Sequence, residues 1–200
     1  MRIAFLFVLL AALPAAAQER FLEFHSDIRI AANGELFVTE RIVAQVEQRE
    51  IKRGILRDFP TDYRDRTGAR VKVPFEVVAV SRNGNTAPWS VGPFANGQRI
   101  RIGHADVPMP RGRHVSEITY RTSRQLGFFE GHDELYWNVN GNGWTFAMDR
   151  ISADVKLPAA VPASQLKLEA YTGPQGAQGR NYKALARDSG ASFETTRALG

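Results

Sequence analysis

The sequence predicts an all-β protein built as an antiparallel β-sandwich, of the immunoglobulin-like or jelly-roll-like kind. The dipeptide Asn-Gly occurs five times, and it is a strong hairpin signal because both central positions of a type I′ turn need a positive φ. Residues 36–46 alternate between apolar and polar side chains like a half-buried strand, and Glu40 is the one charged residue on the apolar side. Beyond residue 17, apolar side chains do not recur at helical spacing, so long helices are not expected.

The other predicted strands are short runs rich in β-branched and aromatic residues, separated by turn residues. They lie at residues 24–30, 75–82, 98–102, 114–122, 134–139, 150–157, 166–171, 182–186 and 192–196. The charged stretch 49–66 is expected to be a long connection between strands, and residues 107–112, with their two prolines, a rigid turn. Such frequent turns favour a sandwich over alternating strands and helices.

The first 17 residues have the pattern of a secretory signal peptide. Arg2 gives a positive start, an apolar run follows, and three alanines form a small-residue cleavage site before Gln18. The uncharged run from Ile3 to Ala17 would span about 22 Å as a helix, which is shorter than the ~30 Å hydrocarbon core of a bilayer. The sequence therefore predicts a cleaved signal peptide at 1–17, a domain at 18–200, and export to the periplasm or the cell surface.

Composition narrows the chemistry that the mature chain can use. It has no cysteine, so neither disulfides nor thiolate metal sites are available. The formal net charge is +5, or +4 once Arg2 leaves with the signal peptide, and charges of both signs are interleaved. So mild a bias favours contact with an anionic envelope surface over nucleic acid. No cofactor is predicted, and no second apolar stretch approaches the ~18 residues of a membrane span.

The densest charged segment runs from residue 49 to residue 70, with seven cations and four acids. Several arginines beside Phe59 and Tyr63 could grip an anionic glycan, a phosphate or a lipid headgroup, because the guanidinium fork binds such groups bidentately. Alternatively, neighbours such as Arg57 and Asp58 neutralise one another and pin down the connection. The sequence favours this second, structural interpretation.

A second segment, residues 124–144, carries the acidic side chains Glu130, Asp133 and Glu134. With His132 they could ligate a metal, although none of the four histidines has the i, i+4 spacing of a zinc protease. Beside Trp137 and Trp144 they also resemble the acid pair and aromatic platform of a glycosidase. Nucleophilic catalysis has no support, because the chain lacks cysteine and a Gly-x-Ser-x-Gly elbow.

The same segment also has a purely structural interpretation. Two alternating runs would meet across the Asn-Gly turns as the core of one hairpin. These runs are Leu135, Trp137 and Val139 on one strand, and Trp144, Phe146 and Met148 on the next. The sequence favours this hairpin over the metal and glycosidase interpretations.

Together, residues 53–60 (RGILRDFP) and 127–139, with its GFFE and DELYWNV runs, resemble the signature of a bacterial family of predicted membrane proteins, domain of unknown function 2207. The resemblance implies a signal peptide, an extracytoplasmic β-rich domain and membrane association through later transmembrane helices. The chain stops at Gly200, before any such helix, so we expect either a fragment or a truncated copy, and the final strand of the domain is expected to be missing. The family has no established activity. The positions that carry the resemblance are Arg53, Gly54, Arg57, Phe59, Pro60, Tyr63, Arg64, Gly127, Glu130, Asp133, Glu134, Tyr136 and Trp137.

The leading hypothesis is a non-enzymatic module that binds an envelope protein or a glycan. Its candidate binding residues are Arg53, Arg57, Phe59, Tyr63, Arg64, Glu130, Asp133, Glu134, Tyr136 and Trp137. The alternative is a carbohydrate-active enzyme, which requires two of the three carboxylates to face each other across a groove lined by an exposed tryptophan. A third possibility is that the arginines pair with these carboxylates and lock the fold, and a fourth is a plain spacer.

Overall fold

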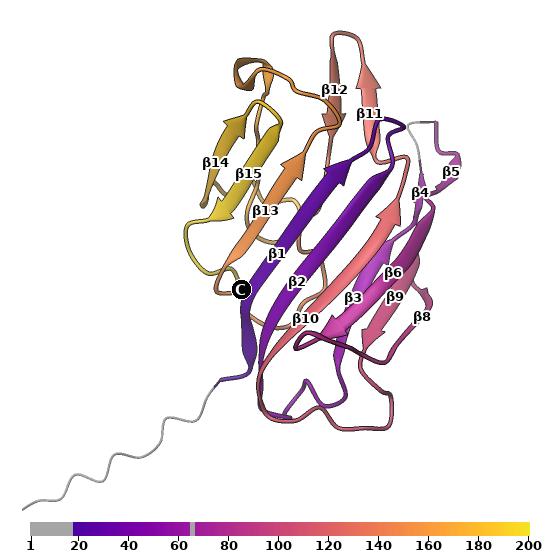
Figure 1. The fold of residues 1–200 in the computed structure, drawn as a ribbon, viewed down its shortest axis with the longest axis vertical. Helices are drawn as coiled ribbons and strands as arrows, with labels where there is room; N and C mark the ends of the chain where they lie inside the picture. The colour runs from indigo at the N-terminus through magenta and orange to yellow at the C-terminus, as the bar shows by residue number, and fades with distance from the viewer. Residues whose placement is uncertain (1–17, 65–66) are drawn as a thin grey trace, which may run out of the picture.

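A large twisted sheet forms one layer of the molecule. The computed structural model describes residues 18–64 and 67–200, and the sheet has eight strands in the order β14-β15-β13-β1-β2-β10-β6-β7 (Figure 1). Their bounds are β1 Arg20–Ile30, β2 Leu36–Val46, β6 Phe75–Arg82, β7 Asn85–Thr86, β10 Gly112–Thr122, β13 Ile151–Lys156, β14 Tyr182–Arg187 and β15 Gly190–Thr195. The three central strands β1, β2 and β10 are each 11 residues long.

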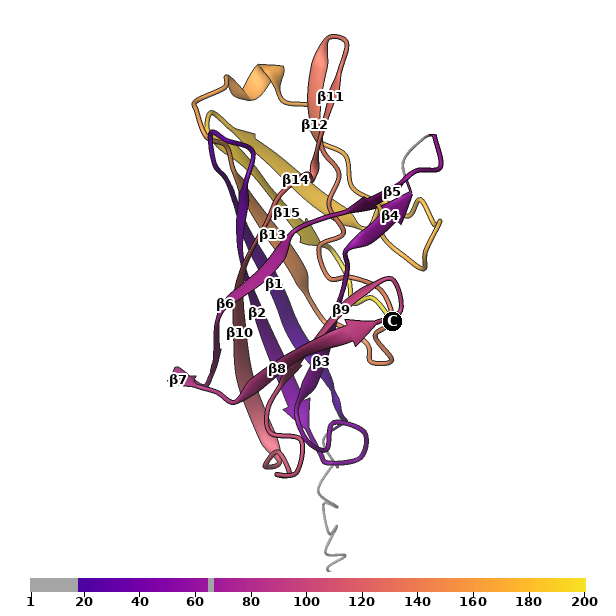
Figure 2. The ribbon, with the colours of Figure 1, turned by 90° about the vertical axis from the view of Figure 1, so that its right-hand side faces the viewer.

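Three smaller sheets complete the fold. A three-stranded sheet, β3-β9-β8, covers part of one face of the large sheet (Figure 2). Its strands are β3 Ile55–Pro60, β8 Trp89–Phe94 and β9 Gly97–Ile102, and the two-stranded sheets are β4 Asp62–Arg64 with β5 Arg70–Lys72 and β11 Leu126–Phe129 with β12 His132–Leu135. The described residues contain one short 3₁₀ helix, Ala163–Gln165, which confirms the prediction of an all-β fold without long helices.

The core lies between the large sheet and the layer that covers it. Alternate residues of β1 and β2, such as Phe24, Ile28 and Ile42, are fully buried on the inner face, as the two-residue period of a strand dictates. Across from them, Ile100 and Ile102 of β9 are equally buried. The outer face of the large sheet stays open and polar.

One pair of strands departs from the antiparallel pattern, because β1 runs parallel to β13. The chain crosses from one end of the sheet to the other after β12, and it therefore enters β13 in the direction of β1 (Figure 1). His25 lies opposite Ser152 in this register. The remaining neighbours in the large sheet pair antiparallel.

Three expectations about single elements were wrong. The stretch 49–66 contains β3 and β4 rather than only a connection. The strand predicted at 134–139 ends at Leu135, and the strand predicted at 166–171 does not form. Residues 166–170 keep an alternating burial pattern, but they have no neighbouring strand to pair with. The predicted signal peptide, residues 1–17, lies outside the described residues.

Candidate functional site

A buried ion pair joins the two layers of the fold. Arg57 of β3 points inward, and its Nε and Nη2 each donate to a carboxylate oxygen of Glu40 on β2 at 2.8 Å. The hydroxyl of Tyr120 on β10 donates to the same carboxylate at 2.9 Å. Arg57 is 2% exposed and the other two side chains are fully buried. Bidentate geometry plus a third donor is the arrangement that allows a charge pair to be buried.

The electrostatics of this cluster hold it in its charged form. Burial alone would lower the pKa of Arg57, but attraction to Glu40 and the hydrogen bonds to it outweigh burial and raise that pKa. Burial, followed by the negative charge of Glu40, raises the pKa of Tyr120 well above its ordinary value. Tyr120 therefore stays protonated and remains a donor to Glu40. The cluster is closed to solvent, so it belongs to the interior of the fold and offers no open site.

Arg57 also connects the two family segments. Its Nη2 lies 3.5 Å from the carbonyl oxygen of Val139, and a Cβ on Gly141 would collide with its Nη1. Arg57 therefore does not pair with Glu130, Asp133 or Glu134, which was one of the possibilities. Asp58 contributes to the neutralisation of Arg57 through its negative charge, but it is not the main partner. Asp58 instead accepts two hydrogen bonds from Arg99 on β9, at 2.5 and 2.7 Å.

The other candidates of the first segment do not converge on a common site. Phe59 is buried and packs against Phe75 and Tyr120, with ring centroids 4.5 and 4.7 Å apart. Arg53 precedes β3 and Arg64 ends β4, so the two exposed arginines lie beyond opposite ends of β3. Arg64 donates to the carbonyl of Gly68 at 2.9 Å. An anion grip shared by these arginines is therefore not formed.

Tyr63 is the remaining candidate of this segment, and it is 43% exposed. Its hydroxyl donates to the carbonyl oxygen of Pro60 at 2.8 Å, which ties the start of β4 to the end of β3. Partial burial raises the pKa of the Tyr63 phenol. The side chain remains accessible to a ligand on one side.

The acidic candidates lie on a hairpin that projects from one end of the molecule (Figures 1 and 2). This hairpin, β11 with β12, carries Glu130 in its turn and Asp133 and Glu134 on β12, all of them exposed. Asp133 and Glu134 are adjacent in a strand, so they point to opposite faces of the hairpin. Asp133 and Glu134 therefore do not face each other across a groove, as the acid pair of a glycosidase must.

Large apolar side chains at the hairpin are also exposed. Phe128 is 74% exposed, Phe129 is 51% exposed, and Tyr136, just after β12, is 76% exposed. Phe129 stacks on His132 across the hairpin, with ring centroids 5.1 Å apart. Phe128 and Phe129 are adjacent in β11, so their rings lie on opposite faces of the hairpin. Accessible aromatic residues on a projection are typical of an interaction site.

The two tryptophans near the acids belong to the core. Trp137 and Trp144 are half-buried and pack against the buried core residues. Trp144 contacts Phe21 edge-on at a ring distance of 4.7 Å, and its Nε1 donates to the carbonyl of Asn140 at 2.5 Å. The expected packing into the core is confirmed, but the expected hairpin was wrong. Asn138 instead accepts a hydrogen bond from the backbone of Gly141, which folds residues 138–144 into an irregular loop.

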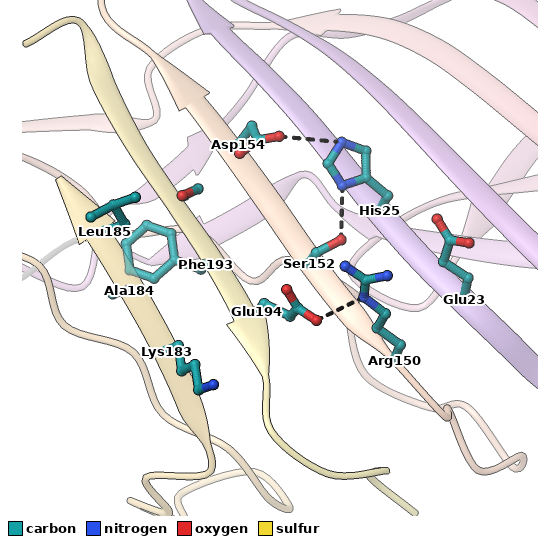
Figure 3. A pocket seen from close by; sticks show the side chains of 11 residues that line it. Glu23, His25, Arg150, Ser152, Asp154, Lys183, Ala184, Leu185, Phe193 and Glu194 are labelled. Atoms are coloured by element: carbon teal, nitrogen blue, oxygen red, sulfur yellow. Dashed lines mark hydrogen bonds and ion pairs between the residues drawn. The ribbon is translucent and has the colours of Figure 1, made fainter. Parts of the chain in front are cut away.

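The outer face of the large sheet has a shallow polar hollow of about 610 Å³ over β1, β13, β15 and β14 (Figure 3). The Nδ1 atom of His25 and the Oγ atom of Ser152 form a hydrogen bond at 2.8 Å. The other ring nitrogen of His25, Nε2, lies 3.8 Å from the Asp154 carboxylate. Arg150 and Glu194 form an ion pair at 2.9 Å. Sequence reasoning missed this hollow, because strands distant in the chain build it and it has no local motif.

This hollow contains the residue types of a catalytic triad, Ser152, His25 and Asp154, but not the surroundings that a triad needs. Ser152 lies within β13, which pairs with β1 on one side and β15 on the other, so the backbone amides around it are committed to the sheet. A hydrolase needs free donors for the oxyanion near its nucleophile. Within residues 18–64 and 67–200, no group of three or more His, Asp or Glu side chains could hold a metal ion.

Comparison with known proteins decides the family. A family model described as the N-terminal domain of a predicted membrane protein, DUF2207, matches residues 20–197. The chain belongs to this family. It is also 28% identical over 164 residues to "Uncharacterized protein YciQ" of Escherichia coli (strain K12), which covers 81% of this chain and 26% of that protein. The chain thus spans about a quarter of the length of this relative.

Solved structures show only distant likeness. Yeast LTA4 hydrolase in complex with bestatin gives a TM-score of 0.49 at 10% identity, over 88% of this chain and 28% of that one. An M1 zinc metallopeptidase from Deinococcus radiodurans gives 0.44 at 11% identity, over 88% and 38%. At these scores the likeness carries no argument about this chain.

The expected family is therefore confirmed, and it is a family of uncharacterised, predicted membrane proteins with a bacterial relative. In the part of the chain that the structure describes, no helix is both long enough and apolar enough to cross a bilayer. The family gives no activity that could be transferred to individual residues.

Proposed function

We propose that this domain is a non-enzymatic, extracytoplasmic interaction module, which presents the β11–β12 hairpin to a partner protein of the cell envelope. The observation that supports it most directly is the exposure of Phe128 and Phe129 on a projecting hairpin. Burying one phenylalanine side chain contributes about 1.5–3 kcal/mol of favourable free energy, so a partner that covers these exposed rings would gain substantial binding free energy. The family's description as a predicted membrane protein supports a partner at the membrane.

The base of the hairpin makes it a firm support for these rings. Leu126 and Leu135 lie opposite each other at its base and pack against the core. Phe128 and Asp133, the next pair on the same face, extend beyond the core into solvent. The hairpin therefore holds its tip in a fixed place, which lowers the entropy lost on binding.

The charges of the hairpin indicate the chemistry of the partner. Glu130, Asp133 and Glu134 surround the aromatic tip, and all are exposed. Such a tip fits an apolar pocket with a basic rim on a protein. It fits an anionic lipid surface poorly, because the carboxylates would be repelled by the headgroups. Tyr136 extends the contact surface, whereas Arg57, Phe59 and Trp137 support the fold beneath it.

The experiment is capture from detergent-solubilised envelope of the native host, with a photo-crosslinking amino acid at position 129. We expect one membrane or envelope protein to be crosslinked, and the variant Phe128→Ser with Glu130→Lys to weaken its binding at least about 100-fold. The matched control, Val78→Ser with Glu169→Lys, changes an apolar side chain and a charge that are also exposed but lie elsewhere.

Equal binding by the hairpin variant and the control would remove the hairpin from the interface. Crosslinks only to glycan or lipid would contradict a protein partner. Turnover of an envelope polymer by the purified protein, without a captured protein, would overturn the proposal altogether.

A further inference from the structure

The large sheet has an open edge at β14. In the sheet order of the described residues, β14 pairs with β15 on one side and has no strand on the other. At the opposite end of the sheet, β7 is only two residues long and pairs with Ser81 and Arg82 alone, so the rest of β6 also lies at an edge. The edge strand β8 of the smaller sheet contains Pro93, which has no N–H to offer. By contrast, β14 has six residues and no proline or glycine.

A strand at an edge leaves every second backbone N–H and C=O unpaired. Because β14 is paired on one side only, alternate residues of Tyr182–Arg187 direct these groups away from the sheet. Proteins usually protect such an edge with charges, and the type of charge then decides which strands can still add.

The charged side chains within β14 are all positive, and the exposed Asp188 follows directly after the strand. Lys183 and Arg187 lie on the outer face with Leu185 between them, and the Leu185 side chain is 55% exposed. Glu194 lies opposite Lys183 in the register, but it forms its ion pair with Arg150 (Figure 3). Among the described residues, neither Lys183 nor Arg187 has an ion-pair partner, and β14 has no acidic residue.

We propose that β14 is a docking edge for an extended acidic segment of a partner protein, which adds to the large sheet as a further strand. The segment has acidic side chains at two positions four residues apart and an apolar residue midway, because successive side chains on one face of a strand are two residues apart. The acids face Lys183 and Arg187, and the apolar residue packs on Leu185. Backbone hydrogen bonds supply affinity and these side chains supply specificity.

A second copy of this chain is the wrong occupant. Two β14 strands in antiparallel pairing centred on Leu185 would place Lys183 of each opposite Arg187 of the other. Like charges directly opposite each other destabilise a strand pair, and no other register offers an acidic residue in β14. The edge is therefore protected against self-association while it remains open to an acidic strand.

The test uses the purified protein and a capped peptide, Thr-Glu-Thr-Val-Thr-Glu-Thr. We expect saturable binding and slower hydrogen exchange at alternate backbone amides of Tyr182–Arg187. The peptide with lysine in place of glutamate should bind at least tenfold more weakly. The same should hold for a glutamate peptide N-methylated at alternate residues, because it cannot donate to the edge.

Charge reversal on the protein provides the matched comparison. Lys183→Glu with Arg187→Glu should weaken binding of the glutamate peptide at least tenfold and allow the lysine peptide to bind. Lys167→Glu with Arg180→Glu changes the net charge equally at two exposed positions outside β14, and it should leave binding within about twofold. Thermal unfolding of each variant checks that it remains folded.

Two results would overturn the docking edge. One is absence of binding by the glutamate peptide to the unmodified protein, and the other is full binding by the N-methylated peptide. Protection that maps to the β11–β12 hairpin would also contradict it. The hairpin proposal is independent of this edge, because its variants change no residue of β14.

Discussion

The Glu40 carboxylate is the side chain on which the interior depends most. It receives two hydrogen bonds from Arg57 and one from Tyr120, and all three side chains are shielded from water. Arg57 also lies over the Phe59 ring, with its Cζ 4.3 Å from the ring centroid. Removing one member of such a pair leaves an uncompensated buried charge, which is more costly than never having had the pair.

We therefore expect Arg57→Ala to lower the free energy of unfolding by about 3–5 kcal/mol. Tyr120→Phe, which removes one hydrogen bond to a charged group, should cost about 1.5–3 kcal/mol. Arg57→Met combined with Glu40→Met should be less destabilising than the two single changes added together. Urea unfolding of these five variants, the two single methionine changes included, measures these differences. A loss below about 1 kcal/mol for Arg57→Ala would show that the pair contributes little.

Glu19 provides a second prediction at this scale. Its carboxylate accepts hydrogen bonds from the backbone N–H groups of Glu47 at 3.0 Å and Glu50 at 2.7 Å, so it holds the loop after β2. Burial would raise the pKa of Glu19, but the backbone donors, including those of Arg49 and Ile51, together lower it below its ordinary value of 4.5. A lowered carboxyl pKa stabilises the fold above the unfolded-state pKa and loses that effect as the pH falls through the folded-state pKa.

We expect Glu19→Gln to be destabilising at pH 7 and to converge with the unmodified protein as the pH falls below about 4.5, the carboxyl's ordinary value. The measurement is urea unfolding of both proteins between pH 3 and pH 7. Glu169→Gln, a change at an exposed glutamate elsewhere in the chain, serves as the control. A constant difference across this pH range would mean that the carboxylate does not act through its charge.

Among the structural elements, the loop between β12 and β13 determines how the two family segments meet. Gly141 has φ +74° and lies against the guanidinium of Arg57. Gly143 has a similar φ of +85°, but no atom lies within 4 Å of the position that its Cβ would occupy. A side chain at either position would strain the backbone, but only a side chain at position 141 would also collide with Arg57.

Replacing each glycine by alanine measures the cost of the backbone strain and the cost of the clash with Arg57 separately. Gly143→Ala should cost about 1–2 kcal/mol from its positive φ alone, whereas Gly141→Ala should cost clearly more because it also displaces Arg57. The excess should shrink when Arg57 is already alanine. Unfolding free energies of the variants test this. Equal losses at both glycines would show that the Arg57 contact is unimportant.

Strands were predicted correctly from the sequence where one face of the strand is apolar. Prediction failed where the inner face carries a buried charge, or where the segment has no neighbouring strand to pair with. Residues 36–46 were predicted with the bounds of β2, and the inward-facing Glu40 was recognised as unusual. The missed strand β3 has Arg57 on its inner face, which disguises its alternation. Tertiary packing overrode the pattern at Trp137 and Val139, whose side chains reach the core from a loop.

The candidate site followed the same division. The acids of residues 130–134 lie exposed on the hairpin, and their part in binding stays a prediction. The partner of Arg57 could not be inferred, because Glu40 belongs to a different sheet and no local spacing relates the two positions. The same holds for the edge at β14, which exists only because the sheet order places that strand last.

For the molecule as a whole, the two proposed surfaces lie on different elements. The hairpin projects from one end, whereas β14 forms a lateral edge of the large sheet (Figure 1). We therefore expect Phe128→Ser with Phe129→Ser to leave the affinity of the glutamate peptide for β14 within about twofold. Isothermal titration of the double variant measures this. A tenfold loss would show that hairpin and edge belong to one continuous interface.

The parallel pairing of β1 with β13 also affects how fast the chain can fold. Phe24 and Ile151 are register partners although 127 residues separate them. Closing so long a loop is entropically unfavourable, so the chain should refold slowly compared with proteins of local topology. A nascent polypeptide that lacks the last quarter of the sequence would expose the bare side of β1, a template for aggregation. A chaperone that shields this strand would keep newly made chains from associating.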